Sequence, residues 1–391
     1  MSQIVSFLVL TIVALVVLAV ILFLLADYCI AYVRSRATSS QITRLKKAVL
    51  CLAVLIALNG ALIAVSQLTA STPPIQGENS IAELVEVELN GRKQWISLRA
   101  WDRDNPVLLF LAGGPGGTQM AAVRHELAEL EKHFVVVNWD QPGAGKSYNA
   151  DKIRNITAQT YIEDGRALTE YLKERFGQEK IYLVGESWGS ALGIFLASRY
   201  PESYHGFIGT GQMIAFAETE RIDYATAMQI AEQKGDTALV AKLRANGAPP
   251  YYGSDVTWKS AVYLNYLNNA MARQPGIQNP GYNTLRDLAS SEYGLLDKIN
   301  FVRGIVNTFN HVYQQLYEID LRTGYTKLDV PVYFFLGRYD LNAPTVLVEE
   351  YEQLLEAPKK EIVWFEHSGH NPWINERDKF AREVIACFLE S

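Results

Sequence analysis

The stretch IYLVGESWGS, residues 181–190, decides the fold of this chain. It begins with a short apolar run, 181–184, which is typical of a strand buried on both faces of a sheet. A G-x-S-x-G pattern centred on Ser187 follows, and a helical pattern then continues to Tyr200. Glycines on both sides let the chain turn sharply and keep bulk away from the serine. The pattern is short enough to occur by chance in a chain of this length, so alone it is weak evidence. Its position between a strand and a helix favours a nucleophile over an ordinary loop serine.

Four further apolar runs of the same kind lie along the chain, at 107–111, 134–137, 332–336 and 362–365. Helical patterns separate them, so the sequence predicts an α/β fold with a mostly parallel sheet. An antiparallel hairpin is expected at the start of this sheet. There Asn90-Gly91 joins two alternating runs, 83–89 and 94–98.

The alternation of strands and helices stops between about Met213 and Tyr325, where the sequence is mainly helical. We interpret residues 213–325 as a helical cap laid over the carboxyl edge of the sheet. The cap divides the sheet domain into a first part, 80–212, and a second part, 326–391.

Two apolar stretches, about 4–26 and 48–66, precede the sheet domain. Each is long enough to cross a bilayer, so residues 1–75 are predicted to form a transmembrane hairpin. A cleaved signal peptide is the alternative for the first stretch, which lacks a basic start and is too long for one. The loop 27–47 carries five Lys and Arg residues. The positive-inside rule therefore places this loop in the cytoplasm and the sheet domain outside the cell membrane.

Charge and cysteine content exclude several other classes of function. The 391 residues have a net charge of -6, and residues 1–77 contain five basic residues and one acidic residue, so the rest of the chain is acidic, with a net charge of -10. This argues against nucleic acid as a partner. Only Cys387 lies in the soluble part, which leaves no disulfide framework and no cysteine-based metal site there. Position 129 after His125-Glu126 is Leu, so the zinc motif H-E-x-x-H is incomplete. No metal and no cofactor are expected.

A serine nucleophile needs a general base, and the base needs an acid that orients it. Of the four histidines downstream of Ser187, His370 follows the last buried strand, where active-site residues of open α/β sheets lie. His367 is its close competitor. Asp340 directly follows the preceding buried strand, and we predict that it is the acid rather than a plain surface aspartate.

The glycine-rich loop 112–117 follows the strand at 107–111. Few side chains cover its backbone, so its N–H groups can approach a substrate closely. The expected oxyanion hole combines the N–H of Gly114 with that of Trp188, the residue after the nucleophile. A merely flexible glycine-rich turn is the alternative.

Three motifs together resemble the α/β-hydrolase superfamily, in particular its proline iminopeptidase-like serine peptidases, over residues 80–391. The loop AGGPGG at 112–117 is similar to the H-G-G-P-G-G of that branch, and DQPGAGKS at 140–147 to its D-Q-x-G-x-G-x-S. The elbow GESWGS at 185–190 is similar to G-G-S-W-G-S. The resemblance implies an α/β-hydrolase fold with a helical cap and the triad Ser187, Asp340 and His370.

The chain departs from this branch at three places. Ala112 stands where the loop usually opens with histidine, and Glu186 stands where the elbow usually has glycine. The cap also lacks the W-x-x-W-E pattern that is associated with binding the substrate's amino terminus. Glu218 and Glu220 lie nearby and are our candidates for that role, with a solvated helix face as the alternative. Glu186 is expected to face inward beneath the elbow.

The leading hypothesis is a membrane-anchored serine hydrolase, an aminopeptidase acting on short peptides. An esterase or lipase that cleaves acyl esters near the membrane is the second hypothesis. A non-catalytic interaction module is the third, and retention of the serine, aspartate, histidine and glycine loops argues against it. The sequence does not determine the oligomeric state or the natural substrate.

Overall fold

The computed structural model describes residues 2–390, which form two compact units. The first unit contains the N-terminal helices, up to residue 70, together with residues 293–298. The second unit contains residues 71–292 and the described residues from 299 onward, and it carries the whole sheet.

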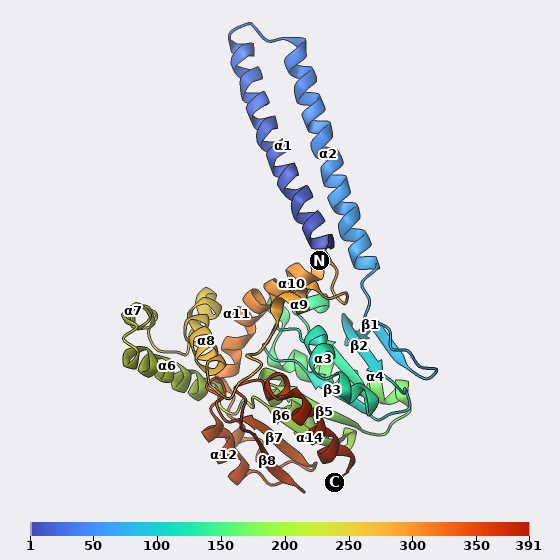
Figure 1. Cartoon of the computed structure of the whole chain (residues 1–391), viewed down its shortest axis with the longest axis vertical. Coiled ribbons are helices and arrows are strands. Elements are labelled where there is room, and N and C mark those ends of the chain that lie inside the picture. The colour runs from blue at the N-terminus through green and yellow to red at the C-terminus, as the bar shows by residue number, and fades with distance from the viewer. Residues whose placement is uncertain (1, 391) are drawn as a thin grey trace. The chain divides into compact units, whose positions relative to one another are not determined.

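Two long helices, α1 (Ser2–Val33) and α2 (Ser39–Leu68), lie side by side and antiparallel in the first unit (Figure 1). Both are long and apolar enough to cross a membrane, and their apolar windows are not buried within the structure.

The connection between these helices is shorter than the predicted loop 27–47. A capping box starts α2: the Thr38 hydroxyl accepts from the N–H of Gln41, and the Gln41 side chain accepts from the N–H of Thr38. Only residues 34–38 stay outside the helices. An α-helix satisfies its own backbone hydrogen bonds in water as well as in lipid, so it continues past the end of an apolar stretch.

An eight-stranded sheet organises the second unit, in the order β1-β2-β4-β3-β5-β6-β7-β8. The β1–β2 and β2–β4 pairs are antiparallel and every other neighbouring pair is parallel. This confirms the predicted fold class. The strands are β1 (Ile81–Leu89), β2 (Arg92–Ala100), β3 (Val107–Leu111), β4 (Val135–Asp140), β5 (Ile181–Glu186), β6 (Tyr204–Thr210), β7 (Val332–Gly337) and β8 (Lys360–Phe365).

The predicted hairpin is confirmed. Ile81 pairs with Ala100 and Leu89 pairs with Arg92, which leaves Asn90 and Gly91 as a two-residue turn. Both turn residues have positive φ, 49° and 77°. Two positive φ values are the mark of a type I′ turn, whose twist matches that of the two strands.

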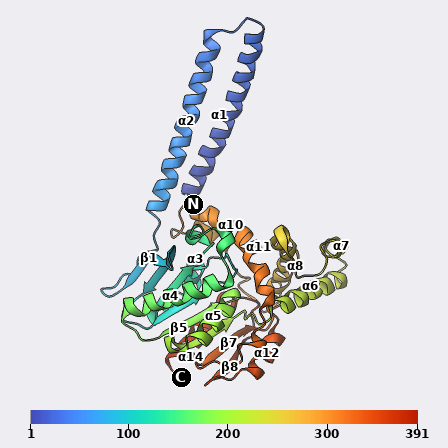
Figure 2. The same cartoon turned by 180° about the vertical axis from the view of Figure 1, so that it is seen from behind.

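Apolar side chains cover both faces of the sheet, which explains the continuous apolar runs of the parallel strands. Along β3, Leu109 and its alternate neighbours join one buried cluster, whereas Leu108 and Phe110 join the other. Helices α4 and α5 pack in the first cluster (Figure 2), and α3 and α14 pack in the second (Figure 1). The flanking helices are α3 (Met120–Glu126), α4 (Ala158–Phe176), α5 (Trp188–Arg199), α12 (Thr345–Leu354), α13 (Pro372–Asn375) and α14 (Arg377–Leu389).

A helical segment connects β6 to β7 in the region expected to form the cap. Its helices are α6 (Phe216–Gln233), α7 (Thr237–Asn246), α8 (Val256–Ala272), α9 (Thr284–Ala289), α10 (Leu295–Arg303) and α11 (Phe309–Val312). The segment is bound to the loops of the sheet, because the Thr308 hydroxyl donates to the carbonyl oxygen of Gly143 at 2.7 Å.

Candidate active site

Ser187 occupies a sharp turn between β5 and α5. Its backbone has φ 53° and ψ -121°, a conformation that side-chain-bearing residues rarely adopt. The flanking glycines are required for space. A methyl group on Gly185 would lie 2.3 Å from the carbonyl oxygen of Gly189, and one on Gly189 would lie 2.0 Å from the carbonyl oxygen of Leu111. The turn therefore has the strained geometry that projects a serine above the end of a parallel strand.

His370 and Asp340 meet at the same edge of the sheet, where β8 and β7 end. The His370 Nδ1 atom lies 3.0 Å from Asp340 Oδ2 and 3.2 Å from Oδ1, and both side chains are almost completely buried. Asp340 also accepts hydrogen bonds from the N–H groups of Asn342, at 2.8 Å, and Ala343, at 2.9 Å. These bonds fix the carboxylate, so it can hold the imidazole in one orientation.

The competing histidine, His367, lies elsewhere. Its side chain is exposed, and it lines a separate surface groove with Asn279 and Glu376. The structure thus brings His370, and not His367, to Asp340.

The glycine loop after β3 is held against the elbow by Gln141, from the loop after β4. The Gln141 amide donates to the carbonyl oxygen of Ala112 at 3.0 Å, and its oxygen accepts from the Trp188 indole N–H at 3.1 Å. The Gly113 N–H is already engaged, because it donates to the Gln119 side chain at 3.3 Å. These contacts give the D-Q-P-G motif a role: it positions the two segments that carry Gly114 and Trp188.

A cavity of about 500 Å³ opens in front of these groups, and we call it the Ser187 cavity. Ser187, His370 and the glycine loop line one side, and residues between 268 and 305 line the other. The titratable side chains at its wall are Glu186, Tyr282, Asp287 and His370. Much of the remaining lining is apolar: Met271, Ala272, Ile277, Pro280, Phe301 and Ile305.

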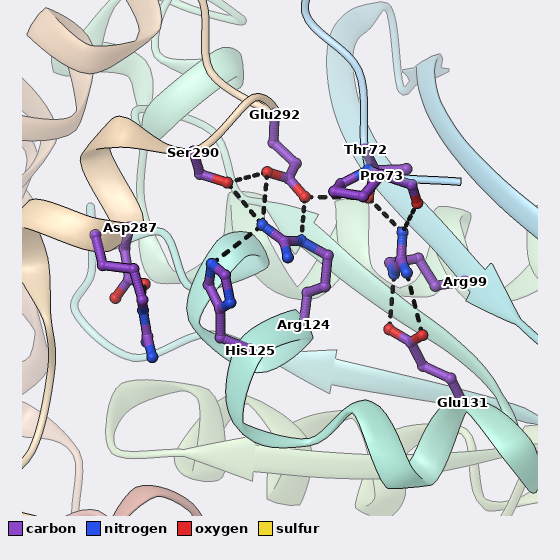
Figure 3. Close-up of polar contacts among 10 residues, drawn as sticks. Thr72, Pro73, Arg99, Arg124, His125, Glu131, Asp287, Ser290 and Glu292 are labelled. Atoms are coloured by element: carbon purple, nitrogen blue, oxygen red, sulfur yellow. Dashed lines mark hydrogen bonds and ion pairs between the residues drawn. The ribbon is translucent and has the colours of Figure 1, made fainter. Parts of the chain in front are cut away.

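An ion-pair network lies next to α9, whose residues Thr284 and Asp287 line the cavity (Figure 3). Arg124, on α3, donates to Glu292 and, at 2.8 Å, to the hydroxyl of Ser290. The hydroxyl of Thr72 donates to the same glutamate at 3.0 Å and accepts from Arg99 at 2.7 Å. Since α3 directly follows the glycine loop, the network ties residues 290–292, next to α9, to the core of the site.

Two glutamates of the expected cap, Glu218 and Glu220, were predicted to bind the substrate. Neither of them is among the described residues that line the Ser187 cavity. Glu218 pairs with Arg322. Glu220 is fully buried and accepts from the hydroxyls of Tyr263 and, at 2.7 Å, Tyr313.

Glu186 is buried, as an inward-facing side chain would be, but its carboxylate also reaches the cavity wall beside Gly113, which was not expected. The room comes from the glycine, since a methyl group on Gly113 would lie 2.1 Å from Glu186 Oε2. The sequence did contain a signal that Glu186 has a special position, because the branch that the chain resembles usually has glycine at this place in the elbow.

The charges around His370 set its protonation. Burial works against protonation, but the negative charge of Asp340, its hydrogen bond and the charge of Glu186 outweigh burial and raise the pKa of His370 to about 8. Below that pH the imidazole is protonated and cannot accept a proton from Ser187.

We therefore expect modification of Ser187 by an uncharged fluorophosphonate to slow as the pH falls through about 8. The labelling rate of the full chain, followed from about pH 6 to about pH 10, measures this directly because the reagent has no amine of its own to titrate. A rate that stays constant across the range would contradict His370 as the base.

Comparisons with known proteins identify the fold family of the chain. The sequence profile described as alpha/beta hydrolase fold matches residues 106–376. The chain is 33% identical over 316 residues to the "Probable aminopeptidase YbaC" of Bacillus subtilis (strain 168), with 79% of this chain and 97% of that protein covered. It is 27% identical over 296 residues to a proline iminopeptidase of Saccharolobus solfataricus, with 73% and 85% covered. The crystal structure of proline iminopeptidase from Mycobacterium smegmatis has the same fold, with a TM-score of 0.56, 19% identity, and 79% and 98% covered.

Proposed function

Because this chain belongs to the alpha/beta hydrolase fold family, we propose that it is a membrane-anchored serine hydrolase that removes the amino-terminal residue from short peptides. The observation that carries the proposal is the pairing of His370 Nδ1 with Asp340 at 3.0 Å beside the strained turn of Ser187. The names of the relatives support an aminopeptidase within the broader class of hydrolases.

The proposed reaction assigns one role to each group. Ser187 Oγ attacks the carbonyl carbon of the first peptide bond, and His370 Nε2 takes its proton and later passes it to the leaving amine. Asp340 holds the imidazole through Nδ1. The N–H groups of Gly114 and Trp188 stabilise the oxyanion, and the position of Trp188 at the start of α5 adds the favourable field of a helix N-terminus. No metal or cofactor has a part in this mechanism.

The size of the Ser187 cavity supports a small substrate. About 500 Å³ accommodates a few residues, and the cap side of its wall excludes a folded protein. A free amino terminus buried in such a cavity requires a carboxylate partner, since an ammonium group loses its hydration there.

We expect a short peptide with a free amino terminus to be cleaved at least about 100-fold faster than its N-acetylated form, measured as kcat/KM. Acetylation removes the positive charge and leaves the carboxylate partner unpaired, which costs a few kcal/mol. Equal rates on the two peptides, or faster cleavage of simple acyl esters, would contradict the aminopeptidase.

The apolar wall of the Ser187 cavity favours a second candidate, a carboxylesterase or lipase-type hydrolase. Met271, Ile277, Phe301 and Ile305 would fit an acyl chain as well as an apolar amino-acid side chain. The same catalytic groups serve both reactions, so only the requirement for an amine separates them.

We also propose that α1 and α2 anchor the enzyme in the cell membrane, with the connection that includes Arg34 and Arg36 in the cytoplasm. The excess of positive charge between the apolar stretches carries this orientation. A protease added to intact cells is expected to digest the domain after residue 70. Protection of that domain until the cells are lysed would contradict the orientation.

A further inference from the structure

Glu186 is the only cavity-lining carboxylate, among the described residues, that lacks a Lys or Arg partner. Its side chain is 3% exposed. Asp287, the other carboxylate at the wall, pairs with Arg286 at 2.8 Å. The ionisable base that lies close to Glu186 is His370, whose Nε2 atom is 3.9 Å from Oε1 of the glutamate.

Neutral donors hold the Glu186 carboxylate in place. The Gln119 amide donates to Oε2 at 2.7 Å, and the Tyr282 hydroxyl approaches Oε1 at 3.5 Å. These contacts fix its direction but add no positive charge. Burial raises the pKa of Glu186, as it does for a carboxylate whose charge is poorly compensated. Among the described residues, Glu186 therefore has no Lys or Arg beside it, and the ionisable base near it, His370, already pairs with Asp340.

We propose that Glu186 binds the α-ammonium group of the substrate. The inference rests on the proposed aminopeptidase function and names the residue that selects its substrate. In an aminoacyl group the nitrogen lies about 2.5 Å from the carbonyl carbon, because only Cα separates them. Ser187 attacks that carbon, and Glu186 is its immediate neighbour in the chain. A carboxylate that shares the cavity wall with Ser187 and His370 is thus within reach of that nitrogen.

An ammonium group at this position completes the polar contacts of the site. It has three N–H donors, and the Glu186 oxygens retain acceptor capacity beyond the bonds from Gln119 and Tyr282. The charge that binding brings compensates the buried carboxylate. A substrate without an amine leaves the Glu186 carboxylate unpaired. Such a substrate is disfavoured because a buried charge without a partner costs free energy.

The test compares two chromogenic substrates that differ only in the amine: alanine p-nitroanilide and propionic acid p-nitroanilide. The ratio of their kcat/KM values is measured with the full chain in detergent. We expect Glu186→Gln to lower the ratio at least about 10-fold, by slowing the alanine substrate much more than the propionyl substrate. Any change in the pKa of His370 acts on both substrates and cancels in the ratio. The amide oxygen can still accept from Gln119, and the amide NH2 can donate to the hydroxyl oxygen of Tyr282, so packing is preserved. Glu186→Asp keeps the charge and is expected to retain a ratio between those of the wild type and Glu186→Gln.

Matched variants separate this role from others. Asp287→Asn changes the other carboxylate at the wall, and Glu220→Gln changes a cap carboxylate; both are expected to leave the ratio at its wild-type value. An equal loss on both substrates in Glu186→Gln, or a fall of the ratio in Glu220→Gln alone, would overturn the inference while the aminopeptidase function stands. A ratio near one in the wild type would overturn that function and the inference with it.

Discussion

Replacement of Ser187 by alanine is expected to lower turnover by about 10⁴-fold or more, since the variant has no nucleophile to form the acyl-enzyme. The fold should persist because alanine fits the space of serine. Its Cβ keeps the same positive φ, so the backbone strain at the turn is unchanged. Steady-state kinetics on the full chain measure the loss, and thermal melting measures stability.

Ser203→Ala is the matched control for this variant. Ser203 is also buried, but its hydroxyl contacts Glu170 away from the Ser187 cavity. Turnover in this control is expected to equal that of the wild type. If Ser187→Ala retained most of its activity, the nucleophile would have to be another residue.

The Asp340→Asn variant is expected to lose about 10³- to 10⁴-fold in kcat with little change in stability. The side-chain oxygen that remains can still accept from the N–H groups of Asn342 and Ala343, so the loop is preserved. The charge that holds the Nδ1 proton of His370 disappears, and the imidazole is no longer kept in the tautomer that accepts a proton from Ser187.

A second readout separates orientation of the imidazole from a general defect. Without the negative charge of Asp340, the pKa of His370 should fall, so the remaining activity should persist to lower pH than in the wild type. His367→Ala serves as the control, because that exposed ring lies in a different groove, and we expect near wild-type rates. A greater loss in His367→Ala than in Asp340→Asn would refute the assignment.

Sequence patterns predicted the positions of Ser187, Asp340 and His370 because each follows a buried strand. Carboxyl ends of parallel strands share one edge of a sheet, so residues far apart in the chain could be expected to meet there. The structure places β5, β7 and β8 in that arrangement and brings His370 to Asp340. The Asn-Gly hairpin was predictable for a different reason, since its turn geometry is local.

The carboxylates could not be placed in the same way. Whether Glu220 faces solvent or the interior depends on Tyr263 and Tyr313, which come from segments far along the chain. The direction of Glu186 depends on the absence of a side chain at Gly113, in the loop that follows β3. The spacing of hydrophobic residues predicts which face of a helix or strand is apolar. It does not identify the polar side chains of the segments that pack against that helix or strand.

The most direct test of the central claim is mass spectrometry of a short, unblocked peptide incubated with the full chain and with Ser187→Ala. We expect the wild type to release the amino-terminal residue and a peptide shorter by that residue, and the variant to release neither. A peptide left intact by a wild-type protein that hydrolyses acyl esters, or one cut from its carboxyl end, would contradict the claim.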